Sequence, residues 1–290
     1  MRKEIEGYTV EDWEDCETNR LFCAVKDNST YFLSMCPQNT PSPRIKEIKD
    51  RFKKDILTGS NVSLPTYIKS GTRWVCVEPY LPSILHGYGA KAFFCLPPAH
   101  RQRILLGAVN ALQTLHWAGL VHGGISSNCF RVIAAKDSSF RTILTGLAYA
   151  GKPTKRKEGY PTGFEAPEMS GGLTEKTDIY ALGAVICFWL TGNFPVRGES
   201  NKLLIPSYVP FGYGVLLAGL LEPDAQKRIT LDRAIEILHN PSLKEGDNYT
   251  KYFMDNSIEE SRMDHIRDIQ EIHTDFSEGF SSKIKSYYNW

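Results

Sequence analysis

The chain has 290 residues, of which 42% are hydrophobic and 23% charged, with 34 Lys and Arg against 33 Asp and Glu. This length allows one large domain or two parts that share an interface, and the apolar fraction excludes a disordered chain. A formal net charge of +1 excludes the broad basic surface of a dedicated nucleic-acid binder.

Membrane and export signals are not found in the sequence. No stretch reaches the roughly 18 consecutive apolar residues that a membrane-spanning helix requires, and the first residues are charged and polar rather than apolar. Seven cysteines are scattered and never form a Cys-x-x-Cys pair, so we expect reduced thiols without a zinc site or a disulfide framework. The sequence therefore predicts a cytoplasmic protein with no membrane span.

The N-terminal part of the sequence predicts strands with one helix among them. Short runs rich in β-branched and aromatic residues, separated by turn residues, are typical of strands. The predicted strands are 8–13, 21–26, 30–36, 64–69 and 73–80. After the third strand, Ser42 and Pro43 mark a helix start, and apolar residues from Ile45 to Ile56 recur at helical spacing.

From residue 98 onward the apolar residues recur mainly at helical spacing. The predicted helices are 100–118, 179–190, 214–221 and 231–238, with short apolar runs at 130–134 and 142–147. A last helix starts at Ser257 with a capping box, and its apolar stripe from Met263 to Ile272 would pack on the chain itself or on a partner. This order of elements predicts an α+β fold with a small β-rich lobe and a larger α-rich lobe.

Five short motifs follow one another between residues 115 and 230. They are Leu115-His116, Val121-His122, Glu165-Ala166-Pro167-Glu168, Thr177–Gly183 and Glu222–Thr230. In this order the chain resembles a eukaryotic-type protein kinase over roughly residues 8–242. The resemblance implies a bilobal kinase-like domain over 1–242, with an N-lobe of about 1–80 and a C-lobe of about 81–242. Residues 243–290 would then be a C-terminal helical extension.

Four residues are structural anchors in this resemblance. Glu168 would form a buried ion pair with Arg228, tying the end of the activation segment to the last helices. Asp178 would lie at the start of the central buried helix, and His122 would pack under the catalytic loop. Taken singly, these residues could be surface charges or a helix N-cap. Their joint order favours the kinase-like interpretation.

The catalytic loop departs from the family pattern His-Arg-Asp-Leu-x-x-x-Asn. Here it reads His-Gly-Gly-Ile-Ser-Ser-Asn-Cys over 122–129. Gly124 stands at the catalytic base, Ser126 at the lysine that balances the transferred phosphate, and Cys129 at the asparagine that holds magnesium. Glycine has no side chain to accept a proton, and Mg²⁺ prefers oxygen ligands to sulfur. Asn128, one residue early, is the substitute candidate.

The other residues that hold nucleotide and metal in kinases are replaced as well. Leu144 stands at the metal-binding aspartate of Asp-Phe-Gly, and leucine offers no ligand. Met35 or Ser34 stands at the strand lysine, and Lys26 imitates that lysine motif but belongs to strand 21–26. No glycine occurs between Tyr8 and Leu21, where kinases place the phosphate-binding loop.

The helix that starts at Ser42 is strongly basic. Its basic residues are Arg44, Lys46, Lys49, Arg51, Lys53 and Lys54. These charges could dock an acidic partner, but a solvated helix face is the preferred interpretation. Glu47 is the counterpart of the family's helix glutamate, and without its lysine we expect it to be a solvated charge.

Together the departures predict a catalytically inactive kinase-fold protein, a pseudokinase, acting as a scaffold, allosteric activator or decoy. Its partner would be a protein, such as an active kinase or a kinase substrate. We expect no cofactor and no metal; ATP would bind, if at all, weakly and without Mg²⁺ at the hinge around Glu78 and Tyr80. Two alternatives remain. One is an atypical nucleotide transferase, which needs acidic residues such as Glu47, Glu78 and Asp137 to converge, and the other is a metal-independent nucleotide-binding switch.

Overall fold

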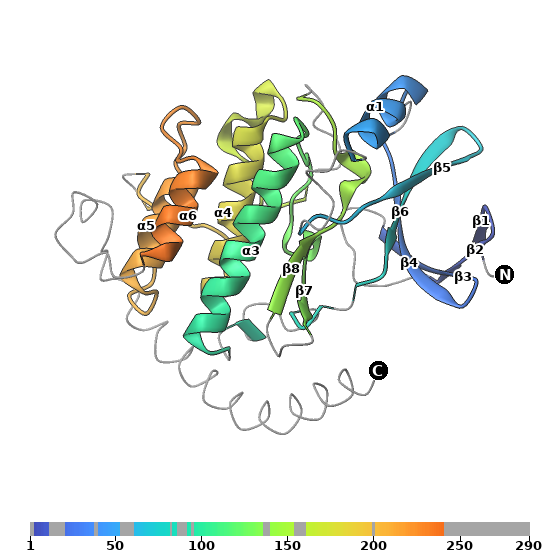
Figure 1. Cartoon of the computed structure of the whole chain (residues 1–290). Helices are drawn as coiled ribbons and strands as arrows, with labels where there is room; N and C mark the ends of the chain where they lie inside the picture. The colour runs from blue at the N-terminus through green and yellow to red at the C-terminus, as the bar shows by residue number, and fades with distance from the viewer. Residues whose placement is uncertain are drawn as a thin grey trace.

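The computed structural model describes residues 3–11, 21–37, 40–52, 61–81, 83–85, 92–93, 96–135, 140–153, 161–198 and 201–240. Within these residues the fold is mixed α+β, with eight strands and five helices. A curled antiparallel sheet lies on one side and four helices, α3 to α6, lie on the other, with α1 beside the sheet (Figure 1). The α+β class expected from the sequence is confirmed.

Six strands form the larger sheet in the order β1-β2-β3-β4-β6-β5, and all neighbours are antiparallel. Their bounds are β1 Lys3–Ile5, β2 Tyr8–Glu11, β3 Leu21–Lys26, β4 Ser29–Met35, β5 Thr66–Ser70 and β6 Arg73–Pro79. A two-residue turn joins β3 to β4, and its residues Asp27 and Asn28 both have positive φ. Asp and Asn tolerate this conformation, which suits the twist of a hairpin. Strand β1 has no counterpart among the strands expected from the sequence.

The two faces of this sheet bury different residues. Leu33, Val75 and Val77 belong to a small cluster on the outer face, which Met35 and Tyr31 partly cover. Side chains alternate along a strand, and paired residues share a face. The opposite face therefore carries Phe32, Ser34, Cys76 and Glu78, and it is turned toward the rest of the molecule.

Helix α1, Ser42–Phe52, is tied to the rest of the chain by its basic residues. Arg44 donates to the carbonyls of Tyr149 and Ala150, Lys49 to that of Tyr67, and Arg51 to that of Ala118. These side chains are internal tethers, so the expectation of a solvated basic face is wrong for three of the six. Sequence spacing could not show this because the acceptors are backbone groups distant in the chain.

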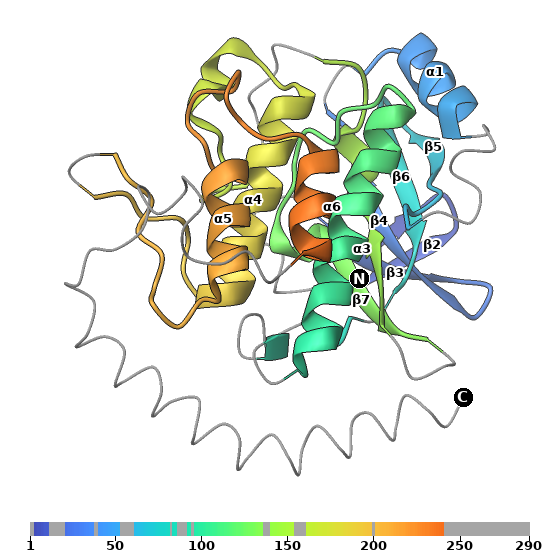
Figure 2. The same cartoon turned by 60° about the vertical axis from the view of Figure 1, so that its left-hand side comes forward.

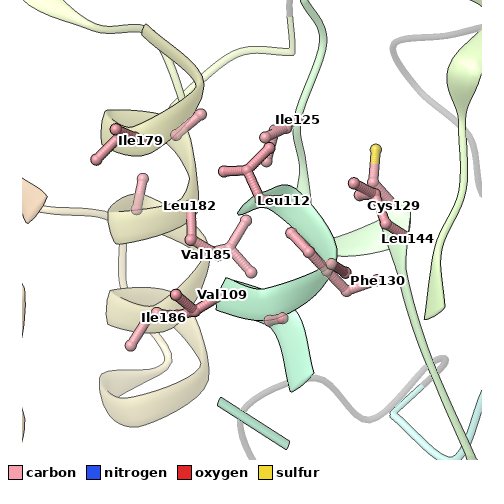
Figure 3. Close-up of a cluster of buried hydrophobic side chains, with 14 of the residues drawn as sticks. Val109, Leu112, Ile125, Cys129, Phe130, Leu144, Ile179, Leu182, Val185 and Ile186 are labelled. Atoms are coloured by element: carbon pink, nitrogen blue, oxygen red, sulfur yellow. The ribbon is translucent and has the colours of Figure 1, made fainter. Parts of the chain in front are cut away.

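The helical part packs around α4, Glu175–Thr191, whose residues are almost all buried. The other helices are α3 Pro98–Trp117, α5 Phe211–Leu220 and α6 Leu231–His239. Figure 2 shows α4, α5, α6 and α3 side by side, and α4 and α3 contribute facing residues such as Leu182, Val185 and Leu112 to the main core (Figure 3). The N-cap of α4 is Thr174, so Asp178 is free for another role.

A short strand pair lies between α3 and α4 in the chain. Strand β7, Phe130–Ala134, pairs with β8, Phe140–Leu144, and the two strands lie at the short apolar runs of the sequence, 130–134 and 142–147. The helix expected from Ser257 and the proposed boundary at residue 242 fall outside the described residues or at their edge, so they stay predictions. No described helix has both the length and the apolar character needed to cross a bilayer.

Candidate functional site

Asp178 organises the loop that begins at His122. Its Oδ2 accepts the backbone N–H of His122 at 2.7 Å and faces Nε2 of His116 at 3.1 Å, and its Oδ1 accepts the N–H of Gly123 at 3.0 Å. The carboxylate is fully buried one turn into α4. A buried carboxylate needs such donors to replace lost water. Asp178 therefore fixes the start of the 122–129 loop to the core.

The loop then runs beside the segment that follows β8. His122 is fully buried, and its Nε2 lies 2.9 Å from the carbonyl oxygen of Thr145. The N–H and Oγ1 of Thr145 in turn donate to the carbonyl of Cys129, at 2.7 and 3.1 Å. The loop and the 144–146 segment are thus locked together by hydrogen bonds at both ends of the loop.

His122 and Cys129 form an electrostatic pair inside this loop. Burial is the largest influence on the pKa of His122 and lowers it, but Cys129, Asp178 and the backbone of Thr145 together outweigh burial and raise it to about 9. Burial is likewise the largest influence on the pKa of the Cys129 thiol and raises it, but the charge and hydrogen bond of His122 and the hydrogen bonds of Ser126 together lower it. Cys129 Sγ also faces the carbonyl of Gly124 at 3.4 Å and Oγ of Ser126 at 3.5 Å. Sequence spacing does not indicate this pair, because no electropositive residue directly adjoins Cys129 in the chain.

The positions expected to carry phosphotransfer hold no carboxylate. Gly124 and Leu144 are buried, and Leu144 packs in the main core beside Cys129 (Figure 3). Asn128 is exposed within a short 3-10 helix, Ser127–Cys129. Across the described ranges no three His, Cys, Asp or Glu residues gather as a metal site would require. The loop is therefore held in place by buried hydrogen bonds, and neither Gly124 nor Leu144 carries a carboxylate.

Glu78 is a buried carboxylate that contacts the segment following β8. Its side chain is 1% exposed, and its Oε2 accepts the N–H of Gly146 at 2.9 Å and of Leu147 at 3.2 Å. Oε1 has no hydrogen-bond donor among the described residues. Burial raises the pKa of the Glu78 carboxyl, although the two backbone N–H groups and the charge of His122 act against it.

At the expected hinge, a side chain therefore takes part in addition to the strand backbone. The Glu78 side chain points inward from β6 and holds the 146–147 backbone. Tyr80 donates its N–H to the carbonyl of Thr30 at 3.2 Å, and its ring lies 4.9 Å from that of Phe32. Both Glu78 and Tyr80 therefore make contacts within the chain.

Ser34, Met35 and Lys26 are the remaining candidates on the strands. Ser34 faces the inner side of the sheet, whereas Met35 packs with the outer cluster, so Ser34 is the alternative that stands where the strand lysine would point inward. Lys26 lies over the Tyr8 ring at 4.6 Å.

Glu47 is solvated, with 39% of its side chain exposed, and it also forms ion pairs with Arg51 at 3.1 Å and Lys152 at 2.8 Å. Neither of these ion pairs involves Glu78. Asp137, the third acidic candidate of the transferase alternative, lies outside the described residues.

Glu168 and Arg228 form a two-point ion pair. Arg228 Nη1 donates to Oε1 at 2.5 Å, and Nη2 donates to Oε2 at 3.0 Å. The Arg228 side chain is fully buried and Glu168 is 28% exposed. Arg228 also donates to the carbonyls of Glu222 and Lys176. The pair joins the segment before α4 to the segment between α5 and α6.

Comparison with known proteins gives distant, partial matches to protein kinases. The chain is 28% identical over 152 residues to the L-type lectin-domain containing receptor kinase VIII.1 of Arabidopsis thaliana, covering 47% of this chain and 21% of that protein. It is 28% identical over 153 residues to the probable inactive receptor kinase RLK902 of the same plant, covering 49% and 23%. It is 27% identical over 168 residues to mouse sperm motility kinase Z, covering 53% and 33%.

No family model matches the chain. The matched region spans about a fifth to a third of these relatives' length. Both inactive and other kinases are among the names. These matches suggest a kinase-like superfamily.

Proposed function

We propose that this chain is a catalytically inactive, kinase-like protein that acts through protein partners as a scaffold, allosteric activator or decoy. The observation that carries the proposal is the loop of 122–129. The hydrogen bonds that hold this loop are formed, while Gly124, Cys129 and Leu144 replace the base and both metal ligands. A loop kept in place without its reacting groups favours a role for the folded surface rather than for transfer chemistry.

The chemical argument is one of cumulative loss. In sites whose residues act as a unit, removing one key group already costs several orders of magnitude in rate. Here no side chain can take the proton from a substrate hydroxyl at Gly124, and none can bind Mg²⁺ at Leu144. Glu78 cannot replace them readily, because its Oε2 is committed to the backbone of Gly146 and Leu147.

The retained bonds support a preserved two-lobed shape as part of this proposal. The Glu168–Arg228 pair and the Asp178 hydrogen bonds hold the helical part, and Arg44 and Arg51 tie α1 to it. A partner would bind this surface in an intracellular compartment, and it would need neither nucleotide nor metal.

The test uses in-cell crosslinking of the full chain, followed by reconstitution of each recovered partner as pure protein. Wild type and Ser126→Ala should bind a partner equally, because Ser126 stands at a position without chemistry. Glu168→Ala should bind while it is folded and lose binding at the lower temperature at which it melts. Binding by Glu168→Ala that persists above its melting temperature, or loss confined to Ser126→Ala, would contradict the proposal.

A further inference from the structure

Two side chains from distant parts of the sequence meet beside the hinge. The guanidinium carbon of Arg131, on β7, lies 4.5 Å from the ring centre of Phe32, on β4. Phe32 is 1% exposed and Arg131 3% exposed. A buried arginine is rare unless its surroundings compensate for lost water, and the face of the Phe32 ring is one group that does so here.

The sheet register places Phe32 at the hinge. It pairs with Glu78, and its side chain therefore shares the inner face of the sheet with the Glu78 side chain. The ring of Tyr80 packs against it at 4.9 Å. Phe32 thus lies directly against the inner face of the strand end that would present hinge backbone to a nucleobase.

The position of Arg131 follows from β7. Its neighbours Phe130 and Val132 point into the main core, so Arg131 points the other way, toward the sheet. Val132 is bonded to the segment that leaves the hinge: its N–H donates to Ser83 Oγ at 3.0 Å, and its carbonyl accepts the N–H of Ile84 at 2.9 Å. These bonds hold β7, and with it Arg131, next to the hinge.

Groups at the hinge also form hydrogen bonds within the chain. The N–H of Tyr80 donates to Thr30, and the adjacent Glu78 carboxylate reaches across to Gly146 and Leu147. An adenine that bonded to this backbone would have to lie flat against the inner face of the strand. That is the place where Phe32 and Arg131 are stacked.

We propose that Arg131 is a built-in substitute for a nucleobase, and that its stack on Phe32 closes the hinge position to adenine nucleotides. A guanidinium is planar and stacks on aromatic faces much as a base does. The two parts of the fold are then held together without a ligand. The inference goes beyond the proposed function, because a scaffold could function with or without bound nucleotide, and it argues against the switch alternative.

The test measures equilibrium binding of a fluorescent ATP analogue to the purified full chain in EDTA, with unlabelled adenosine as competitor. Wild type should show no saturable binding up to about 1 mM, the upper end of ordinary enzyme substrate affinities. Arg131→Ala, which removes the stacked group, should gain saturable binding that adenosine displaces. The matched control is Arg141→Ala, on the neighbouring strand, where the arginine is exposed; it should remain unable to bind.

Thermal melting of Arg131→Ala, Phe32→Leu and the double variant checks the stack itself. The melting temperature of the double variant should fall by less than the sum of the single losses, as expected for residues in direct contact. Should Arg131→Ala fail to fold, Phe32→Leu takes its place in the binding assay. Saturable binding by wild type overturns the proposal, as do strictly additive losses or a folded variant that gains no binding. Binding by wild type without phosphate transfer would leave the proposed function standing.

Discussion

Replacing Glu168 by alanine removes one half of the ion pair with Arg228. Arg228 is fully buried, so the variant leaves a guanidinium without its counter-charge. Breaking a buried pair in this way costs about 3–5 kcal/mol. Glu168 itself is 28% exposed, so water can reach the site. The carbonyls of Glu222 and Lys176 also still accept from Arg228. The loss should therefore lie near the lower end, about 3 kcal/mol.

The assay is thermal unfolding followed by circular dichroism. At about 2–4 °C per kcal/mol for a domain of this size, Glu168→Ala should lower the melting temperature by about 6–12 °C. The matched control is Glu236→Ala, which removes the same group from an exposed pair with Arg233. Exposed pairs contribute about 1 kcal/mol or less, so this variant should stay close to wild type. Ser126→Ala should also change the melting temperature little, because among the described residues its Oγ has only Cys129 Sγ as a hydrogen-bond partner, at 3.5 Å. Equal melting of Glu168→Ala and Glu236→Ala would refute the reasoning.

Three further outcomes follow from buried contacts. The raised pKa of Glu78 favours its neutral form, a contribution present below about pH 4.5 and lost as pH rises through the folded-state pKa. Glu78→Gln should therefore melt at or above wild type at neutral pH, with the advantage shrinking toward acid pH, whereas Glu78→Ala should melt lower. Asp178→Asn should lose roughly 3 kcal/mol, because the amide group cannot accept both loop N–H bonds, and hydrogen exchange at His122 should accelerate. Gly183→Ala should cost about 1–3 kcal/mol in denaturant unfolding, since a Cβ there would lie 2.8 Å from that of Leu220. A lower melting temperature of Glu78→Gln at neutral pH, or unchanged stability of Asp178→Asn or Gly183→Ala, would remove the corresponding contact from the account.

Local patterning in the sequence was enough to predict most elements. Strand β3 matches the predicted strand 21–26, because β-rich runs and turn residues act over a few positions. Strand β7 coincides with the apolar run 130–134, whereas β8 ends at Leu144, before the segment that Glu78 and Thr145 hold. The class of fold could therefore be predicted from the sequence, whereas the ends of individual strands and helices depend on tertiary contacts.

The site was predictable only in part. Motif order pointed to His122, Asp178, Glu168 and Arg228, and these residues make the contacts described above. Whether Ser34 or Met35 faces inward depends on a one-residue register, which reverses every side chain of a strand.

The inward turn of Glu78 and the stacking of Arg131 on Phe32 join segments far apart in the chain. Spacing within a single sequence carries no signal for such contacts. The same holds for the electrostatic pairing of His122 with Cys129 across the folded loop.

The most direct measurement of the central claim is transfer of radiolabelled γ-phosphate by the purified full chain, with Mg²⁺ and with Mn²⁺, to itself and to generic protein substrates. We predict no incorporation above that of heat-denatured chain, because Gly124 and Leu144 supply neither a base nor a metal ligand. Stoichiometric labelling that Glu78→Gln abolishes, while Glu236→Ala retains it, would contradict this account and assign the chemistry to Glu78.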